Sequence, residues 1–94
     1  MLRLVTIDLT AADLNAFERY EAEVLELVPK HGGRLELRVR ALDGRTETHL
    51  LYFPDEAAFE GFRADPGRLA LSGDWEQCGA RSTIQLVERV PPSD

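Results

Sequence analysis

The chain has 94 residues, enough for one domain with a single, thin hydrophobic core. Its net charge of −6 argues against binding to nucleic acid or to an anionic membrane, because both partners favour a basic surface. The only cysteine, Cys78, cannot form an intrachain disulfide, and no apolar run is long enough to cross a bilayer. Residues 1–9 contain Arg3 and Asp8 and lack a cleavage site, so we expect no signal peptide and a soluble, cytoplasmic protein.

The first part of the chain predicts a strand followed by a helix. In residues 2–9 both the odd-numbered and the even-numbered positions are mainly apolar, which is typical of a central strand that is covered on both faces. Thr10 and Asp13 have the spacing of a capping box and predict the start of a helix. The helix shows an apolar stripe made by Leu14, Phe17, Tyr20, Val24, Leu27 and Val28. Its polar side is expected to carry Glu18, Arg19, Glu21, Glu23 and Glu26.

The segment "PKHGG" predicts the end of this helix. Pro29 lacks the N–H group that would continue the hydrogen-bond ladder, and Lys30 and His31 place positive charge at the negative end of the helix dipole. Gly32 or Gly33 can adopt the left-handed conformation that terminates helices. We therefore assign His31 a structural role.

The next segment predicts a β-hairpin. Residues 34–42 alternate between an apolar face and a charged face, and residues 46–53 return as the second strand. With Asp43 and Gly44 as the two central turn residues, the register pairs Arg40 with Glu47, Arg38 with His49 and Leu37 with Leu50. The charged face is then complementary within itself, as expected for a solvated edge.

The remaining segments complete a β-α-β-β-α-β order. Asp55 is the predicted N-cap of a helix with Ala58, Phe59 and Phe62 on its apolar side, and Asp65-Pro66 ends or kinks it. Residues 67–81 predict a short helical turn and then a loop. Residues 82–90 form the last strand, which we place at the centre of the sheet, and residues 91–94 an unstructured tail.

This order predicts a single α+β domain over residues 1–90 with the ferredoxin-like fold, a four-stranded antiparallel sheet with two helices on one face. The other face of the sheet would be bare and apolar, which is too large an exposed patch for a monomer. We therefore expect a homodimer that pairs through the sheet faces.

Several segments resemble the dimeric α+β barrel superfamily. They are the "KHGG" helix end, the strand after it, the stretch "LLYFPDEAAFEGF" and Tyr20 on the first helix. The nearest likeness is to the uncharacterised domain-of-unknown-function 1330 family, over nearly the whole chain. That family usually has an Arg-Gly step after the double glycine, whereas this chain has Arg38-Val39 and Arg40-Ala41. The resemblance implies a homodimer whose sheets face each other, and it implies no catalytic residue.

Several side chains have the chemistry of a catalytic or ligand-binding site. His49 lies in a strand beside apolar residues and opposite Arg38, which would favour a neutral imidazole able to act as a base. Arg38, Tyr20, Tyr52 and Trp75 are the candidate substrate-binding residues, and Asp8 could orient a partner. Each also has a structural interpretation: a solvated edge histidine, amphipathic core tyrosines, a packing tryptophan and a strand-end carboxylate. No metal-ligand spacing, phosphate-binding glycine loop or dinucleotide fingerprint is present, so we expect no metal and no cofactor.

Two classes of function remain open. The first, suggested by the resemblance, is a cofactor-free enzyme of the monooxygenase or isomerase type that acts on an aromatic or lactone-like metabolite. The second is a non-catalytic dimeric module for ligand binding or interaction, because no catalytic constellation converges in the sequence. A deep pocket near His49 would favour the first class, and a core filled with Leu and Phe side chains would favour the second.

Overall fold

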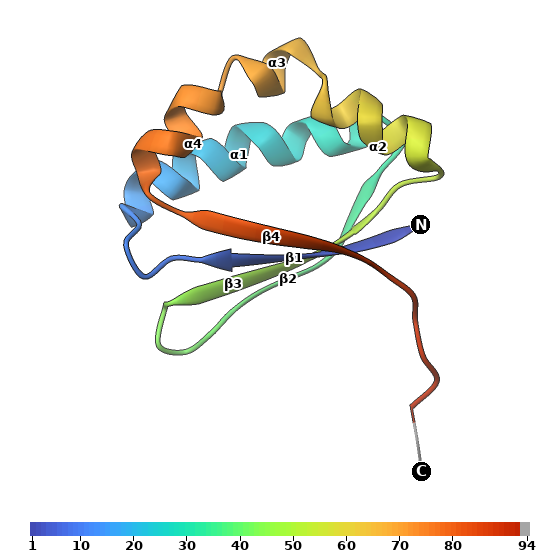
Figure 1. The fold of residues 1–94 in the computed structure, drawn as a ribbon, viewed down its shortest axis with the longest axis horizontal. Helices are drawn as coiled ribbons and strands as arrows, with labels where there is room; N and C mark the ends of the chain where they lie inside the picture. The colour runs from blue at the N-terminus through green and yellow to red at the C-terminus, as the bar shows by residue number, and fades with distance from the viewer. Residues whose placement is uncertain (93–94) are drawn as a thin grey trace.

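The computed structural model describes residues 1–92, and its sheet has the predicted ferredoxin-like topology (Figure 1). The strands are β1 (Leu2–Asp8), β2 (Arg34–Arg40), β3 (Thr46–Tyr52) and β4 (Arg81–Val87). They form one antiparallel sheet in the order β2-β3-β1-β4. The helices are α1 (Leu14–Lys30), α2 (Glu56–Arg63), α3 (Pro66–Leu69) and α4 (Ser72–Cys78), and all lie on one face of the sheet.

Two predictions about the last part of the chain need correction. The last strand is an edge strand, because β1 and β3 hold the two central positions. In residues 67–81, the predicted short helical turn corresponds to α3, but the predicted loop contains a further helix, α4. Of the predicted tail, residues 91–92 belong to no helix or strand, and residues 93–94 lie outside the described residues. Within residues 1–92, no helix is long and apolar enough to span a membrane.

Helix α1 begins later than the capping box predicted. Asp13 is the N-cap, and its carboxylate accepts a hydrogen bond from the backbone N–H of Ala16 at 3.1 Å. Thr10 lies in the preceding turn, where its backbone N–H donates to the Asp8 carboxylate at 2.9 Å. An aspartate before Leu14 is itself a favoured N-cap, and it lies closer to the first buried residue, Phe17.

The end of α1 is built as the sequence predicts. His31 is the C-cap, and Gly32 has the left-handed φ of 75°. Gly33 is needed for a different reason, because a Cβ atom there would lie 2.7 Å from the Phe53 ring. The His31 ring also contacts Asp65, with 2.7 Å between Nε2 and Oδ2, and so ties this helix end to the segment between α2 and α3. These contacts give His31 a structural role.

The β2–β3 hairpin has the predicted register but a different turn. Arg40 pairs with Glu47, Arg38 with His49 and Leu37 with Leu50, as predicted. The turn bond runs from the backbone N–H of Gly44 to the carbonyl of Ala41, so its central residues are Leu42 and Asp43. The prediction of Asp43-Gly44 as the central pair was therefore wrong. Gly44 follows the turn with a φ of 75°, as in longer hairpin loops.

The pairing of β2 with β3 is interrupted by a bulge. Leu35 pairs with Leu51, whereas Leu37 pairs with Leu50, so β2 has one residue more than β3 over this stretch. Beyond the bulge, Arg38 and Arg40 lie on the helix-covered side of the sheet and Leu37 on the open side.

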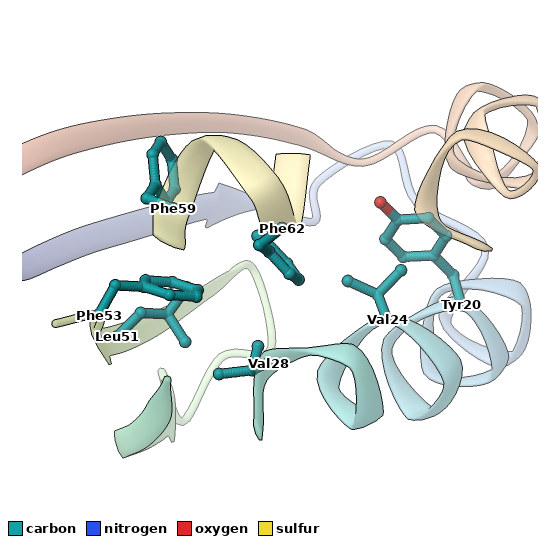
Figure 2. Close-up of a cluster of buried hydrophobic side chains, with 7 residues drawn as sticks. All are labelled: Tyr20, Val24, Val28, Leu51, Phe53, Phe59 and Phe62. Atoms are coloured by element: carbon teal, nitrogen blue, oxygen red, sulfur yellow. The ribbon is translucent and has the colours of Figure 1, made fainter. Parts of the chain in front are cut away.

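The core fills the space between the sheet and the helices. One cluster lies under α2 and the second half of α1, and Figure 2 shows its members: Tyr20, Val24, Val28, Leu51, Phe53, Phe59 and Phe62. A second cluster lies where α1 and α4 meet the sheet, and comprises Ile7, Leu9, Phe17, Cys78 and Ala80. Trp75 packs against both clusters.

Candidate functional site

A cavity of about 400 Å³ lies between the sheet and the helices. Its walls are mainly apolar and aromatic, with side chains that include Tyr20, Val24, Leu51, Phe59, Phe62 and Trp75. The polar residues along the wall are Glu21, His49, Arg63, Arg68, Ser72 and Ser82. An apolar cavity with a few polar groups is the usual form of a small-molecule site.

His49 is a buried wall residue of this cavity, and only 3% of it is exposed. Strand β3 alternates between buried and half-buried residues, which places Glu47, His49 and Leu51 toward the helices. Burial lowers the pKa of His49 below its ordinary value of 6.5, because a charged imidazole is poorly solvated there. The hydrogen bond to Glu47 opposes that shift, and Arg38 adds to it. The imidazole is therefore neutral at pH 7.

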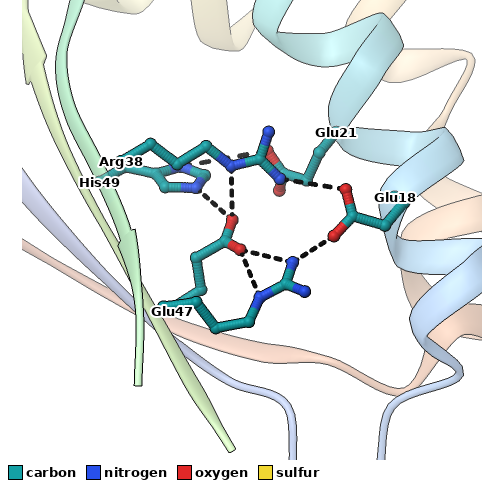
Figure 3. A network of polar contacts seen from close by, with 6 residues as sticks. Glu18, Glu21, Arg38, Glu47 and His49 are labelled. Carbon is teal, nitrogen blue, oxygen red and sulfur yellow. Dashed lines mark hydrogen bonds and ion pairs between the residues drawn. The ribbon is translucent and has the colours of Figure 1, made fainter. Parts of the chain in front are cut away.

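Glu47 anchors His49 (Figure 3). Its Oε2 lies 2.6 Å from Nε2 of His49 and 2.9 Å from Nε of Arg38. Its Oε1 lies 2.9 Å from Nε and 2.7 Å from Nη2 of Arg40. Burial opposes ionisation of this carboxyl, but the hydrogen bonds from His49, Arg40 and Arg38 lower its pKa. Glu47 is therefore a carboxylate, and Nε2 of His49 must carry the proton that joins them.

This network corrects the expectation of a solvated edge. Glu47 and His49 are both buried, and β3 is an internal strand of the sheet. Arg38 and Arg40 are about one-third exposed and reach over the Glu47 carboxylate. Both arginines also contact Glu18 on α1, so the network joins the hairpin to the helix. Charge complementarity across the hairpin was predicted correctly, but its burial was not.

Glu21 is the site residue that the sequence interpretation missed. It was assigned to the polar side of the first helix, yet only 4% of it is exposed and it lines the cavity. Its Oε2 lies 4.0 Å from Nδ1 of His49, the ring nitrogen that Glu47 leaves free. Burial raises the pKa of Glu21 to about 7. Its spacing from Phe17 (four residues) and Val24 (three residues) was the available signal, because both spacings place it within the apolar stripe.

Two of the other predicted site residues belong to the cavity wall. Tyr20 and Trp75 both line it, and their ring centroids are 5.1 Å apart. Burial raises the pKa of the Tyr20 hydroxyl above its ordinary value. The structure thus brings His49, Tyr20 and Trp75 together, although Trp75 is far from the other two in the sequence.

The other candidates lie elsewhere. Tyr52 lies on the open side of the sheet, where the guanidinium of Arg34 stacks on its ring at 4.2 Å. Arg38 does not line the cavity; it donates a hydrogen bond to Glu47, which in turn holds His49. Asp8 is an exposed strand-end carboxylate, and the hydrogen bond from the backbone of Thr10 lowers its pKa. Within residues 1–92, no group of three or more His, Cys, Asp or Glu side chains is arranged to hold a metal ion.

Comparison with known proteins supports the fold. No family model matches the chain, and no curated protein matches it in sequence. In structure it is similar to SnoaB, a cofactor-independent oxygenase from Streptomyces nogalater, with a TM-score of 0.73 and 16% identity over 98% of this chain and 97% of that chain. A candidate antibiotic biosynthesis monooxygenase from Nitrosomonas europaea matches with a TM-score of 0.68 and 10% identity over 93% of this chain and 98% of that chain. A dimeric ferredoxin-like protein of unknown function from a Jannaschia species matches with a TM-score of 0.67 and 15% identity over 93% of this chain and 100% of that chain. At these identities the likeness shows a common fold.

Proposed function

We propose that this protein is a cofactor-free small-molecule enzyme, of the oxygenase or isomerase type, that acts on an aromatic or lactone-like metabolite. The observation that carries the proposal is the position of His49, a neutral imidazole in the wall of an aromatic cavity with one nitrogen fixed by a carboxylate. The structural likeness to a cofactor-independent oxygenase supports it.

In this proposal His49 is the general base. Because Nε2–H donates to Glu47, Nδ1 holds the free lone pair and can accept a proton from the ligand. The electron pair of the broken bond stays on the ligand, and the imidazolium is stabilised by the Glu47 carboxylate. The ligand anion then either reacts with dioxygen or regains a proton at another atom, which gives the oxygenase and isomerase outcomes respectively.

The remaining candidate residues differ in how directly they would act on the ligand. Tyr20 and Trp75 offer aromatic surface to a planar ligand, and the Tyr20 hydroxyl can hydrogen-bond to it. Arg38 acts as a positioning residue, since it holds Glu47 in place. Tyr52 has no role in this mechanism, because it lies on the opposite side of the sheet. Kinship with the domain-of-unknown-function 1330 family stays a prediction.

We also propose that the protein works as a homodimer through the open side of the sheet. Leu37 and Val39 lie on that side and are 47% and 48% exposed, and a second copy would remove this apolar surface from water. The structural likeness to a dimeric ferredoxin-like protein is consistent with this assembly.

The test compares the two histidines. A panel of phenols, quinols and lactones is incubated with the protein without added cofactor, and oxygen uptake and exchange of ligand protons with deuterated solvent are followed. His49→Gln should abolish any turnover found, whereas His31→Gln, which changes the histidine outside the cavity, should retain it. Binding in the cavity without turnover of any ligand would instead favour the non-catalytic ligand-binding module.

A further inference from the structure

Glu21 and His49 form a pair of proton-binding groups at one place in the cavity wall. Glu21 comes from α1 and His49 from β3, and 4.0 Å separates Oε2 of Glu21 from Nδ1 of His49. That separation is too long for a direct hydrogen bond. Within residues 1–92, this long contact is the only ion-pair contact of the Glu21 carboxyl, although the residue is almost fully buried. Both residues line the cavity, so a ligand there can hydrogen-bond to Oε2 of Glu21 and to Nδ1 of His49.

We propose that Glu21 and His49 bind a hydroxyl group of the ligand between them, so that the cavity selects a phenol or another hydroxylated compound. This inference rests on the proposed function, because it assigns the ligand chemistry of the same cavity. It makes Glu21 a ligand-binding residue.

The geometry suits a single hydroxyl oxygen. An oxygen about 2.8 Å from each of the two atoms fits between them, because they are 4.0 Å apart. The angle at that oxygen would be about 90°, within the range of hydroxyl hydrogen bonding. A hydroxyl is both a donor and an acceptor, whereas a ketone or lactone carbonyl is only an acceptor.

The charges around the pair favour one shared proton near neutral pH. The charged groups that act on Glu21 come from four elements: Glu18 on α1, Arg38 on β2, Glu47 on β3 and Arg68 on α3. Burial raises the pKa of Glu21 to about 7; Arg38 and Arg68 oppose this shift, and Glu47 and Glu18 add to it. Burial lowers the pKa of His49. At a pH between these two pKa values, protonated Glu21 donates and neutral His49 accepts. A pair that holds one proton therefore complements a hydroxyl group.

The test uses phenol and toluene, which differ by one hydroxyl group. Trp75 is the only tryptophan of the chain and lines the cavity, so its fluorescence reports binding directly. Glu21→Leu should weaken the binding of phenol relative to toluene by about tenfold, since the hydroxyl loses one of its two hydrogen-bond partners. Glu23→Leu is the matched control, because Glu23 is exposed on the same helix, and it should leave the ratio unchanged.

A second variant tests the shared proton. In the wild type, phenol affinity should fall by about threefold to tenfold as the pH rises from 6 to 8.5, because ionised Glu21 can no longer donate. Phenol itself stays neutral in this range, as the tyrosine hydroxyl does. Glu21→Gln keeps an amide donor at every pH, so its phenol affinity should stay constant over the same range.

The outcomes separate the two proposals. If neither compound binds to the wild type, the cavity is not a ligand site and both proposals are wrong. If both bind but Glu21→Leu leaves the phenol-to-toluene ratio unchanged, the role of Glu21 is wrong and the proposed function stands. A fall in affinity with pH that persists in Glu21→Gln would also overturn the shared-proton arrangement.

Discussion

Replacement of Glu47 by alanine tests the buried network that holds His49. Removing one partner of a buried ion pair typically costs about 3–5 kcal/mol, because the other charge is left without compensation. Here the side chains of Arg38 and Arg40 are 33% and 34% exposed, so water can partly solvate them, and His49 can remain neutral. We therefore expect Glu47→Ala to lower the free energy of unfolding by a smaller amount, about 2–3 kcal/mol. For a domain of this size, that corresponds to a fall in Tm of roughly 10–20 °C.

Urea denaturation followed by circular dichroism measures this loss, and the slope against denaturant should not change. Glu18→Ala is the comparison, because Glu18 contacts the same two arginines but its side chain is 46% exposed, and it should cost less than about 1 kcal/mol. The pKa of Glu47 is lowered in the folded state, so its contribution is present above its ordinary pKa of 4.5 and is lost as the pH falls through the folded-state value. Equal losses for Glu47→Ala and Glu18→Ala at pH 7 would refute the argument from burial.

Three further predictions concern other parts of the molecule. Gly33→Ala should destabilise the protein by about 1–3 kcal/mol in urea, because its Cβ would lie 2.7 Å from the Phe53 ring; an unchanged midpoint would contradict this. Glu21→Leu should become progressively more stable than the wild type from pH 4.5 to about 7 and keep that advantage above it, since the raised pKa of Glu21 means that its ionisation opposes folding; a constant difference would be the wrong result. Light scattering should give about twice 10.6 kDa for the wild type and a smaller mass for Leu37→Asp, whereas a monomeric wild type would rule out the homodimer.

Much of the fold could be predicted because local patterns and packing agree. The register of the hairpin followed from alternation and a turn signal, and it was right at Arg38 and Arg40. The turn itself was not, because a four-residue loop (42–45) that begins with a turn at Leu42 and Asp43 gives the same register as a two-residue turn at Asp43-Gly44. The edge position of β4 also escaped prediction, because its apolar residues are typical of a central strand. Ile84 is apolar and lines the cavity, although it lies on an edge strand and is half-exposed.

The candidate site was harder to predict because its burial depends on contacts between distant segments. His49 was predicted from its apolar neighbours and Trp75 as an aromatic residue of a loop, and both line the cavity. Glu21 was missed because its charge suggested the exposed side of the helix. Its position four residues after Phe17 and seven before Val28 instead places it on the buried side. Tyr52 was included for its hydroxyl, but strand alternation places its side chain on the other face of the sheet from that of His49.

The bulge in β2 also bears on how this chain should be compared with its relatives. Because Leu35 and Leu37 pair with consecutive residues of β3, position 36 is an insertion within a strand. A related chain without the bulge would align correctly only with a gap of one residue at position 36. Without that gap, residues on the helix-covered side of β2 would be matched to residues on the open side. In such an alignment Arg38 would be matched to a residue on the open side, and a counterpart of this arginine in the related chain would be overlooked. Residues around this site should therefore be compared between related proteins after their strands have been superposed.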